Sequence, residues 1–221
     1  MVSVVLPTKG RAAQAARCVE RFLQTSRGYG VEVVVVTDED PETVAACRDS
    51  GALVLDPPVS RGAIWAWNFG AAIAEGDVLV LGADDLWPMH GWCGEMLERM
   101  AAFPEGDGLV GFNDLARRGE ELATHYAMSR RYCARYNGGV LACPKYRHFY
   151  IDNEANARAK RAGRFVWAEF AVLEHRHPAW QKAPVDAGYA ARQPWIDGDA
   201  QTFFERAQAG FPDDFDPVVV W

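Results

Sequence analysis

Four short apolar runs, rich in valine and leucine, recur within the first 83 residues and constrain the fold more than any other feature. None of them alternates regularly between apolar and polar residues, a pattern typical of strands buried on both faces of a sheet. Helical patterns separate the runs, so the sequence predicts βαβ units, right-handed crossovers and a mostly parallel sheet. The runs cover residues 2–7, 31–36, 51–56 and 77–83, and the helical patterns cover 12–25, 41–48 and 62–75.

The pattern becomes less regular after Asn113. Residues 113–139 are polar and mixed, and no element is predicted there. Further elements are expected on either side of this stretch. They are helices over 89–102, 150–163 and 199–209, and strands over 107–112 and 164–175. No repeat and no linker divides the 221 residues, so we expect a single α/β domain with a regular first half and an irregular second half.

Charge is unevenly distributed along the chain. The net charge of −7 argues against a protein that coats nucleic acid nonspecifically, because that mode requires many Lys and Arg side chains against phosphates. Residues 115–165 nevertheless carry eleven Lys and Arg against four Asp and Glu. This basic segment is either a solvated surface or a binding surface for a polyanionic partner such as modified DNA or a phosphate-bearing lipid.

The five cysteines are odd in number, widely spaced and free of any CxxC pair, which is typical of reduced thiols in a cytoplasmic protein. The first residues lack the basic and apolar regions of a secretory signal. No stretch approaches the roughly 20 apolar residues of a transmembrane helix. We therefore expect a soluble, cytoplasmic protein without a transmembrane segment.

Acidic residues follow the second and fourth apolar runs directly: Asp38 ends one, and Asp84 and Asp85 end the other. In open α/β sheets ligands collect at the carboxyl ends of the strands. The two adjacent acids are interpreted either as a simple turn or as a site for Mg²⁺ or Mn²⁺, which prefer carboxylate oxygens. Neither the G-x-G-x-x-G dinucleotide fingerprint nor a P-loop occurs.

Taken in order, five blocks of the sequence resemble those of family 2 glycosyltransferases, which have the GT-A fold. The resemblance extends over residues 2–178. It implies a Rossmann-like, mostly parallel sheet flanked by helices, and a nucleotide-sugar substrate. The blocks are VSVVLPTKGR, VEVVVVTDEDPET, SRGAIWAWNFGAAIAEGDVLVLGADD, IDNEANARAKRAG and VLEHRHP.

Donor-site residues follow from this resemblance, position by position. Asp38 is expected to contact the base, and Asp84 to ligate the metal, with Asp85 following it. The family commonly reads D-x-D-D here, and this chain has Gly82 where the first Asp would stand. The remaining residues expected beside the nucleotide are Pro7, Thr8, Arg11, Arg61, Gly62 and Asn68.

The catalytic base implied by the resemblance is Asp152, although Ile151 replaces the Glu that commonly precedes it. Asp152 also opens a predicted helix and can be interpreted as its N-cap; the two roles are compatible. His175 is expected to be a partner of the cation. His177 points the same way from a strand, and its role is left open.

The resemblance thus implies transfer of a sugar from a nucleotide-diphospho-sugar, expected to be UDP-linked, to an acceptor hydroxyl with inversion and with Mn²⁺ or Mg²⁺. Two alternatives remain: a nucleotidyltransferase of related fold, and a noncatalytic nucleotide-sugar-binding module. The expected organisation is one GT-A domain over 1–221. Within it, 1–113 binds the nucleotide sugar, 114–190 forms the acceptor and catalytic half, and 191–221 forms a C-terminal helix and tail.

Overall fold

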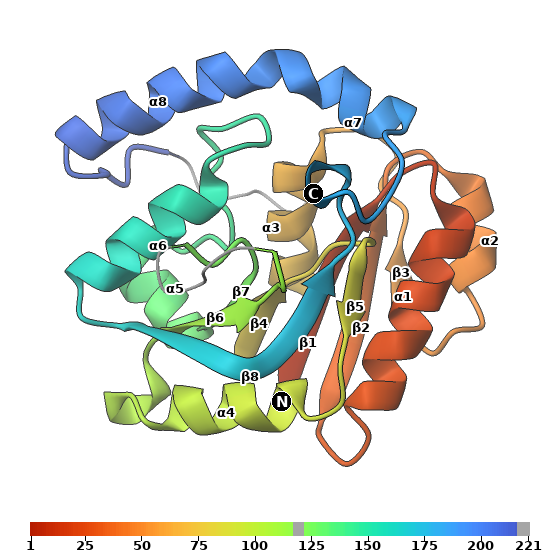
Figure 1. Cartoon of the computed structure of the whole chain (residues 1–221), viewed down its shortest axis with the longest axis horizontal. Coiled ribbons are helices and arrows are strands. Elements are labelled where there is room, and N and C mark those ends of the chain that lie inside the picture. Colours follow the sequence, from red (N-terminus) through yellow and green to blue (C-terminus); the bar gives the residue numbers. More distant parts are fainter. Residues whose placement is uncertain (117–121, 216–221) are drawn as a thin grey trace.

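The computed structural model describes residues 1–116 and 122–215, and its centre is one mixed β-sheet flanked by helices (Figure 1). In this described part the strand order is β3-β2-β1-β4-β7-β6-β8-β5. The strands are β1 (Val2–Thr8), β2 (Val31–Thr37), β3 (Leu53–Leu55), β4 (Val78–Leu81), β5 (Leu86–Pro88), β6 (Leu109–Asn113), β7 (Tyr126–Ser129) and β8 (Phe165–His175). The α-helices are α1 (Ala12–Thr25), α2 (Pro41–Cys47), α3 (Ala63–Ile73), α4 (Trp92–Ala101), α5 (Arg130–Tyr136), α6 (Ile151–Arg161), α7 (Ala187–Arg192) and α8 (Ile196–Gln208).

The apolar runs of the first half form the parallel part of the sheet. β1 pairs in parallel with β2 on one side and β4 on the other, and β3 continues the sheet beyond β2. This confirms the predicted α/β fold with its mostly parallel sheet. Because these neighbours run in the same direction, the carboxyl ends of β1, β2 and β4 meet at one edge, where ligands collect in such sheets.

The second half completes the same sheet with strands of both directions. β7 runs antiparallel to both β4 and β6, whereas β8 runs parallel to β6. β8 therefore ends, at His175, on the same edge as β4. Neither β7 nor α5 was predicted, because β7 is only four residues long and lies in a stretch of mixed polarity. The predicted strand over 164–175 is confirmed as β8.

Side chains of β1 alternate between two apolar cores, one on each face of the sheet. Val4 and Leu6 pack in the core that contains buried residues of α1 and α4. Val5 faces the opposite core, which contains Trp67 of α3 and residues of α5 and α6. Each such side chain contributes roughly 1.5–3 kcal/mol when fully buried. The two cores hold β1 rigidly behind the edge described above.

All five cysteines are free thiols and buried in these cores. Along the described ranges, 1–116 and 122–215, no helix combines the length and the apolar character needed to cross a membrane.

Gly82 follows β4 at a point where the chain passes close to β1. Its amide donates to the carbonyl oxygen of Val5 (2.9 Å), and its own carbonyl accepts from Trp67 Nε1 (2.7 Å). A Cβ at this position would lie 2.7 Å from that Val5 oxygen and 2.9 Å from Val4 Cγ1. Steric crowding thus explains why glycine replaces the first acid of the D-x-D-D pattern, because a side chain here would press against β1.

We expect Gly82→Ala to lower the free energy of unfolding by about 1–3 kcal/mol, because the added methyl group overpacks against the backbone of β1. Thermal unfolding measures the loss. Gly198→Ala is the matched control, since a Cβ at Gly198 meets nothing within 4 Å and alanine favours the helix there. A Gly82→Ala protein as stable as the wild type would contradict the steric explanation.

Candidate active site

A cleft with a cavity volume of about 1320 Å³ opens at the carboxyl edge of the sheet. Its lining combines the ends of β1, β2, β4 and β8 with the starts of α3 and α6 and with α7. Every residue singled out from the sequence lies on this one cleft, although the role of each remains a prediction. These residues are Pro7, Thr8, Arg11, Asp38, Arg61, Gly62, Asn68, Asp84, Asp85, Asp152, His175 and His177.

Asp84 is buried, and both of its carboxylate oxygens are engaged by side chains. Thr8 Oγ1 donates to Oδ2 (2.7 Å), while Arg11 Nη1 (2.9 Å) and Gln14 Nε2 (3.1 Å) donate to Oδ1. Burial and the neighbouring charge of Asp85 raise the pKa of Asp84, and Arg11 opposes this shift. In this arrangement Asp84 orients Arg11, and its expected role as a metal ligand stays a prediction.

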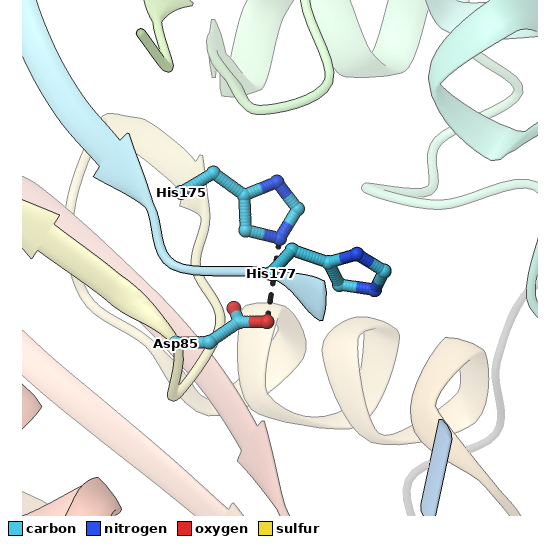
Figure 2. Close-up of side chains that lie close together, drawn as sticks. All are labelled: Asp85, His175 and His177. Atoms are coloured by element: carbon cyan, nitrogen blue, oxygen red, sulfur yellow. Dashed lines mark ion pairs between the residues drawn. The ribbon is translucent and has the colours of Figure 1, made fainter. Parts of the chain in front are cut away.

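Asp85 instead forms a cluster with His175 and His177 (Figure 2). One potential ligand atom from each residue lies within 4.8 Å of the others, and Asp85 Oδ2 is 3.3 Å from His175 Nε2. Although burial acts to raise it, the hydrogen bond and charge of His175 hold the pKa of Asp85 well below its usual range. The two histidines come from the end of β8, separated by one residue.

This cluster fits a divalent metal. Asp85 Oδ1 is buried and has no hydrogen-bond partner within the described ranges, so an acceptor oxygen is available. One carboxylate and two imidazoles form a donor set that suits first-row transition metals. Asp84, Asp85 and His175 were expected at a metal from the sequence; the structure groups Asp85 and His175 with His177, whose role the sequence left open.

Asp152 lies in the first turn of α6 and on the cleft. The interpretation of Asp152 as the N-cap is wrong: the N-cap is Tyr150, which adopts a left-handed conformation with φ of 65°. Asp152 Oδ1 accepts a hydrogen bond from the backbone N–H of Asn153 (3.0 Å). The positive end of the helix dipole favours a carboxylate at this position.

Two buried carboxylates fasten the start of α6 to α8. Asp199 of α8 accepts hydrogen bonds from three consecutive backbone N–H groups, those of residues 147–149, at 2.8–2.9 Å. Glu154 of α6 accepts from Arg158, from both Nε and Nη2 of Arg206, and from Tyr146. Sequence reasoning missed Asp199 and Arg206, because their partners lie about fifty residues away; only the i,i+4 spacing of Glu154 and Arg158 was readable.

At the end of β2 the cleft contains Asp38, which pairs with Lys9 (3.3 Å). Gly62 is the N-cap of α3 with φ of 81°, and Arg61 beside it is exposed over the ring of Trp65 at 5.2 Å. Asn68 also lines the cleft. Its amide bonds in both directions to the backbone of Ala142 and so fixes that segment.

α7 crosses the cleft beside the Asp85–His175–His177 cluster and was not predicted. Asp186, its N-cap, forms two hydrogen bonds with Arg11, at 2.8 and 3.0 Å. Tyr189 donates from its hydroxyl to Asp85 Oδ2 (2.8 Å), and its ring contacts Arg11 (4.2 Å) and His177 (4.6 Å). The sequence shows no sustained periodicity in this short segment, which explains why it escaped prediction.

Residues 3–163 match the family described as Glycosyl transferase family 2. The match covers well over half of the chain, so the protein belongs to this family of glycosyltransferases. A comparison with curated protein sequences finds no match.

Two solved structures show that the fold is GT-A. A mannosyltransferase from Pyrobaculum calidifontis, in complex with GDP-Man and Mn²⁺, has a TM-score of 0.72 and 19% identity, and the match covers 94% of this chain. This chain spans only 64% of that mannosyltransferase. Glucosyl-3-phosphoglycerate synthase from Mycobacterium tuberculosis, in complex with Mg²⁺ and UDP, has a TM-score of 0.62 and 18% identity, covering 97% of this chain and 81% of the synthase.

We expect Glu154→Gln to destabilise the protein by about 3–5 kcal/mol at neutral pH, because two buried guanidinium groups lose a shared carboxylate. Although burial opposes the shift, the hydrogen bond from Arg206 lowers the pKa of Glu154 from 4.5. Its stabilisation is therefore fully present above pH 4.5 and is lost as the pH falls through the lowered pKa.

Denaturant unfolding of wild type and variant between pH 3 and 7 measures this difference, which should shrink at the acid end. Glu98→Gln, at an exposed position of α4, is the matched control and should change stability little at any pH. A difference between Glu154→Gln and wild type that stays constant over this range would contradict the assignment.

Proposed function

We propose that the protein transfers a sugar from a nucleoside-diphosphate donor to an acceptor hydroxyl, with inversion at the anomeric carbon. One observation carries this proposal: a carboxylate in the first turn of α6 and the Asp85–His175–His177 cluster open onto the same cleft of a family 2 glycosyltransferase. UDP is our first expectation for the nucleotide. The similar structures hold both GDP-Man and UDP, so both nucleotides belong in the test.

Mn²⁺ or Mg²⁺ is the proposed cofactor, held by Asp85, His175 and His177. Such a cation supplies positive charge beside the diphosphate as it leaves. The two imidazoles favour Mn²⁺, because Mg²⁺ prefers an all-oxygen environment. Asp84 contributes indirectly in this proposal, by holding Arg11 at the cleft wall (2.9 Å).

Asp152 is the proposed catalytic base. Its carboxylate accepts the proton of the acceptor hydroxyl as that oxygen attacks the anomeric carbon. The bond between this carbon and the diphosphate oxygen breaks on the opposite face, and the nucleoside diphosphate departs with the bonding electrons. Attack and departure on opposite faces invert the configuration. The backbone bonds from residues 147–149 to Asp199 support this role, since they fix the segment that leads into α6.

The nucleoside side is proposed to lie along the ends of β1 and β2. Asp38 would accept from the base or ribose, and Thr8 is held in place by its bond to Asp84. Pro7, Arg61 and Gly62 line the same part of the cleft. Asn68 would act by fixing the backbone at Ala142.

A small acceptor fits the contacts better than a polyanion. Several cations of the basic segment are already paired with acids: Arg131 with Glu105, Arg135 with Asp107, and Arg158 with Glu154. Arg117 and Arg118 of that segment lie outside the described residues. These paired cations support interpreting their part of the segment as a surface stabilised by ion pairs.

The function is tested by incubating the protein and Mn²⁺ with UDP- and GDP-sugars and a set of hydroxyl acceptors, and by identifying the released nucleotide. Release of a nucleoside diphosphate with a glycosylated product supports the proposal. Pyrophosphate as the product would indicate a nucleotidyltransferase. Donor binding without turnover would indicate a binding module.

We expect Asp152→Asn to reduce sugar transfer by roughly 10²–10⁴-fold while donor affinity stays unchanged, because only the proton acceptor is lost. Steady-state rates and calorimetric donor titrations measure the two quantities. Asp197→Asn makes the same change at an exposed position of α8 and should retain activity. Full activity of Asp152→Asn would remove Asp152 from the role of base.

We expect His177→Ala to weaken Mn²⁺ binding by at least about 10-fold, because one of three converging ligands is lost. Calorimetry or the electron paramagnetic resonance signal of free Mn²⁺ measures the affinity directly. His90→Ala, at an exposed position outside the cleft, is the matched control. Equal Mn²⁺ affinity in wild type and His177→Ala would exclude His177 from the metal site.

A further inference from the structure

We propose that Arg11 and Arg192 form an anion subsite for a phosphate of the donor, and that the carboxylate of Asp186 occupies this subsite in the free protein. The inference rests on the proposed function, because the donor supplies the phosphate. It assigns roles to Asp186 and Arg192, neither of which follows from the family resemblance.

The guanidinium of Arg11 is fixed at one side and engaged by an exchangeable partner at the other. Nη1 donates to buried Asp84, so the group is held in a set orientation. Nε and Nη2 both donate to Asp186, at 2.8 and 3.0 Å. The Asp186 side chain is 43% exposed, whereas that of Asp84 is 6% exposed. A partner from solvent can therefore displace Asp186 far more easily than Asp84.

The face of Arg11 that binds Asp186 also suits a phosphate. Two parallel N–H groups of a guanidinium match the oxygens of a carboxylate or a phosphate equally well. Arg11 lies near the proposed metal ligands, since the ring of Tyr189 contacts both Arg11 and His177. A diphosphate held next to that metal would place a phosphate within the region that Asp186 occupies.

Arg192 forms the second side of this subsite. The space beside Gly188 shows how close the two arginines are. A Cβ added at Gly188 would lie 3.6 Å from Arg11 Nη2, 3.9 Å from Arg192 Nη2 and 3.2 Å from Asp186 Oδ1. The two guanidinium groups therefore lie on either side of one point, next to the carboxylate of Asp186. Arg192 lines the cleft and forms no ion pair with any residue of the described ranges. A half-buried cation without an acid partner is costly unless an anion joins it.

Tyr189 connects the same segment to the metal cluster. Its hydroxyl donates to Asp85 Oδ2, an oxygen that also faces His175 Nε2. α7 thus makes two contacts with the donor side of the cleft, a carboxylate on Arg11 and a hydroxyl on Asp85. Binding of a metal-bound diphosphate competes with both contacts. In the free protein the carboxylate of Asp186 therefore takes the place of the phosphate.

The test uses the full chain and titrates inorganic pyrophosphate, UDP, GDP and uridine by calorimetry at fixed Mn²⁺ and ionic strength. Asp186→Asn should bind pyrophosphate and the matching nucleoside diphosphate about three- to fivefold more tightly than the wild type, because the competing charge is gone. Asparagine is also a good N-cap, so α7 is retained. Arg192→Gln should bind both about tenfold more weakly, with uridine binding unchanged.

Matched controls separate the subsite from general charge effects. Asp197→Asn and Arg17→Gln change the same charges at exposed positions outside the cleft and should leave pyrophosphate affinity unchanged. Pyrophosphate affinity of Asp186→Asn equal to or below that of the wild type would overturn the inference, as would Arg192→Gln indistinguishable from Arg17→Gln.

The outcomes also separate this inference from the proposed function. A wild type that transfers sugar, with no tighter binding in Asp186→Asn, would refute the subsite alone. Tighter pyrophosphate binding in Asp186→Asn, with no binding of any nucleotide sugar, would support an anion subsite and refute the proposal that the donor is a nucleotide sugar. Failure of every variant to bind pyrophosphate or a nucleoside diphosphate would refute both.

Discussion

The parallel pairing of β1 with β2 and β4 is the constraint on which the rest of the structure depends. It brings Thr8, Asp38 and Asp84 to one edge of the sheet although up to 76 positions separate two of them in the chain. The two apolar cores keep this edge rigid, since alternate side chains of β1 are anchored on opposite faces. A family 2 glycosyltransferase needs such rigidity, because fixed charges stabilise a transition state only when they do not have to move toward it.

Sequence patterns predicted those parts of the fold that depend on local periodicity. The helix over 12–25 agrees with α1 to the residue, and the four apolar runs form β1 to β4. β7 and α7 could not be predicted, because each is short and owes its stability to distant partners: β7 lies between β4 and β6, and α7 is tied to Arg11 and Asp85. Tertiary contacts of this kind leave no periodic trace in the sequence.

The candidate site was likewise predicted only in part from the sequence. The residues selected by resemblance lie on one cleft, but resemblance could not distinguish the orientations of two adjacent acids. Asp84 turns toward Thr8 and Arg11, while Asp85 turns toward His175. From the sequence, Asp84 was expected to ligate the metal, with Asp85 following it. Their different neighbours shift the pKa values in opposite directions, upward for Asp84 through burial and downward for Asp85 through His175.

The fastening of α6 by α8 has a consequence for how the cleft can evolve. Asp199 and Arg206 lie beyond residue 163, where the family match ends, and Asp199 does not itself line the cleft. They nevertheless hold the backbone that carries Asp152 into place. Substitutions in this outlying helix can therefore tilt the wall of the cleft that carries Asp152 while every residue at the ends of β1, β2 and β4 stays constant.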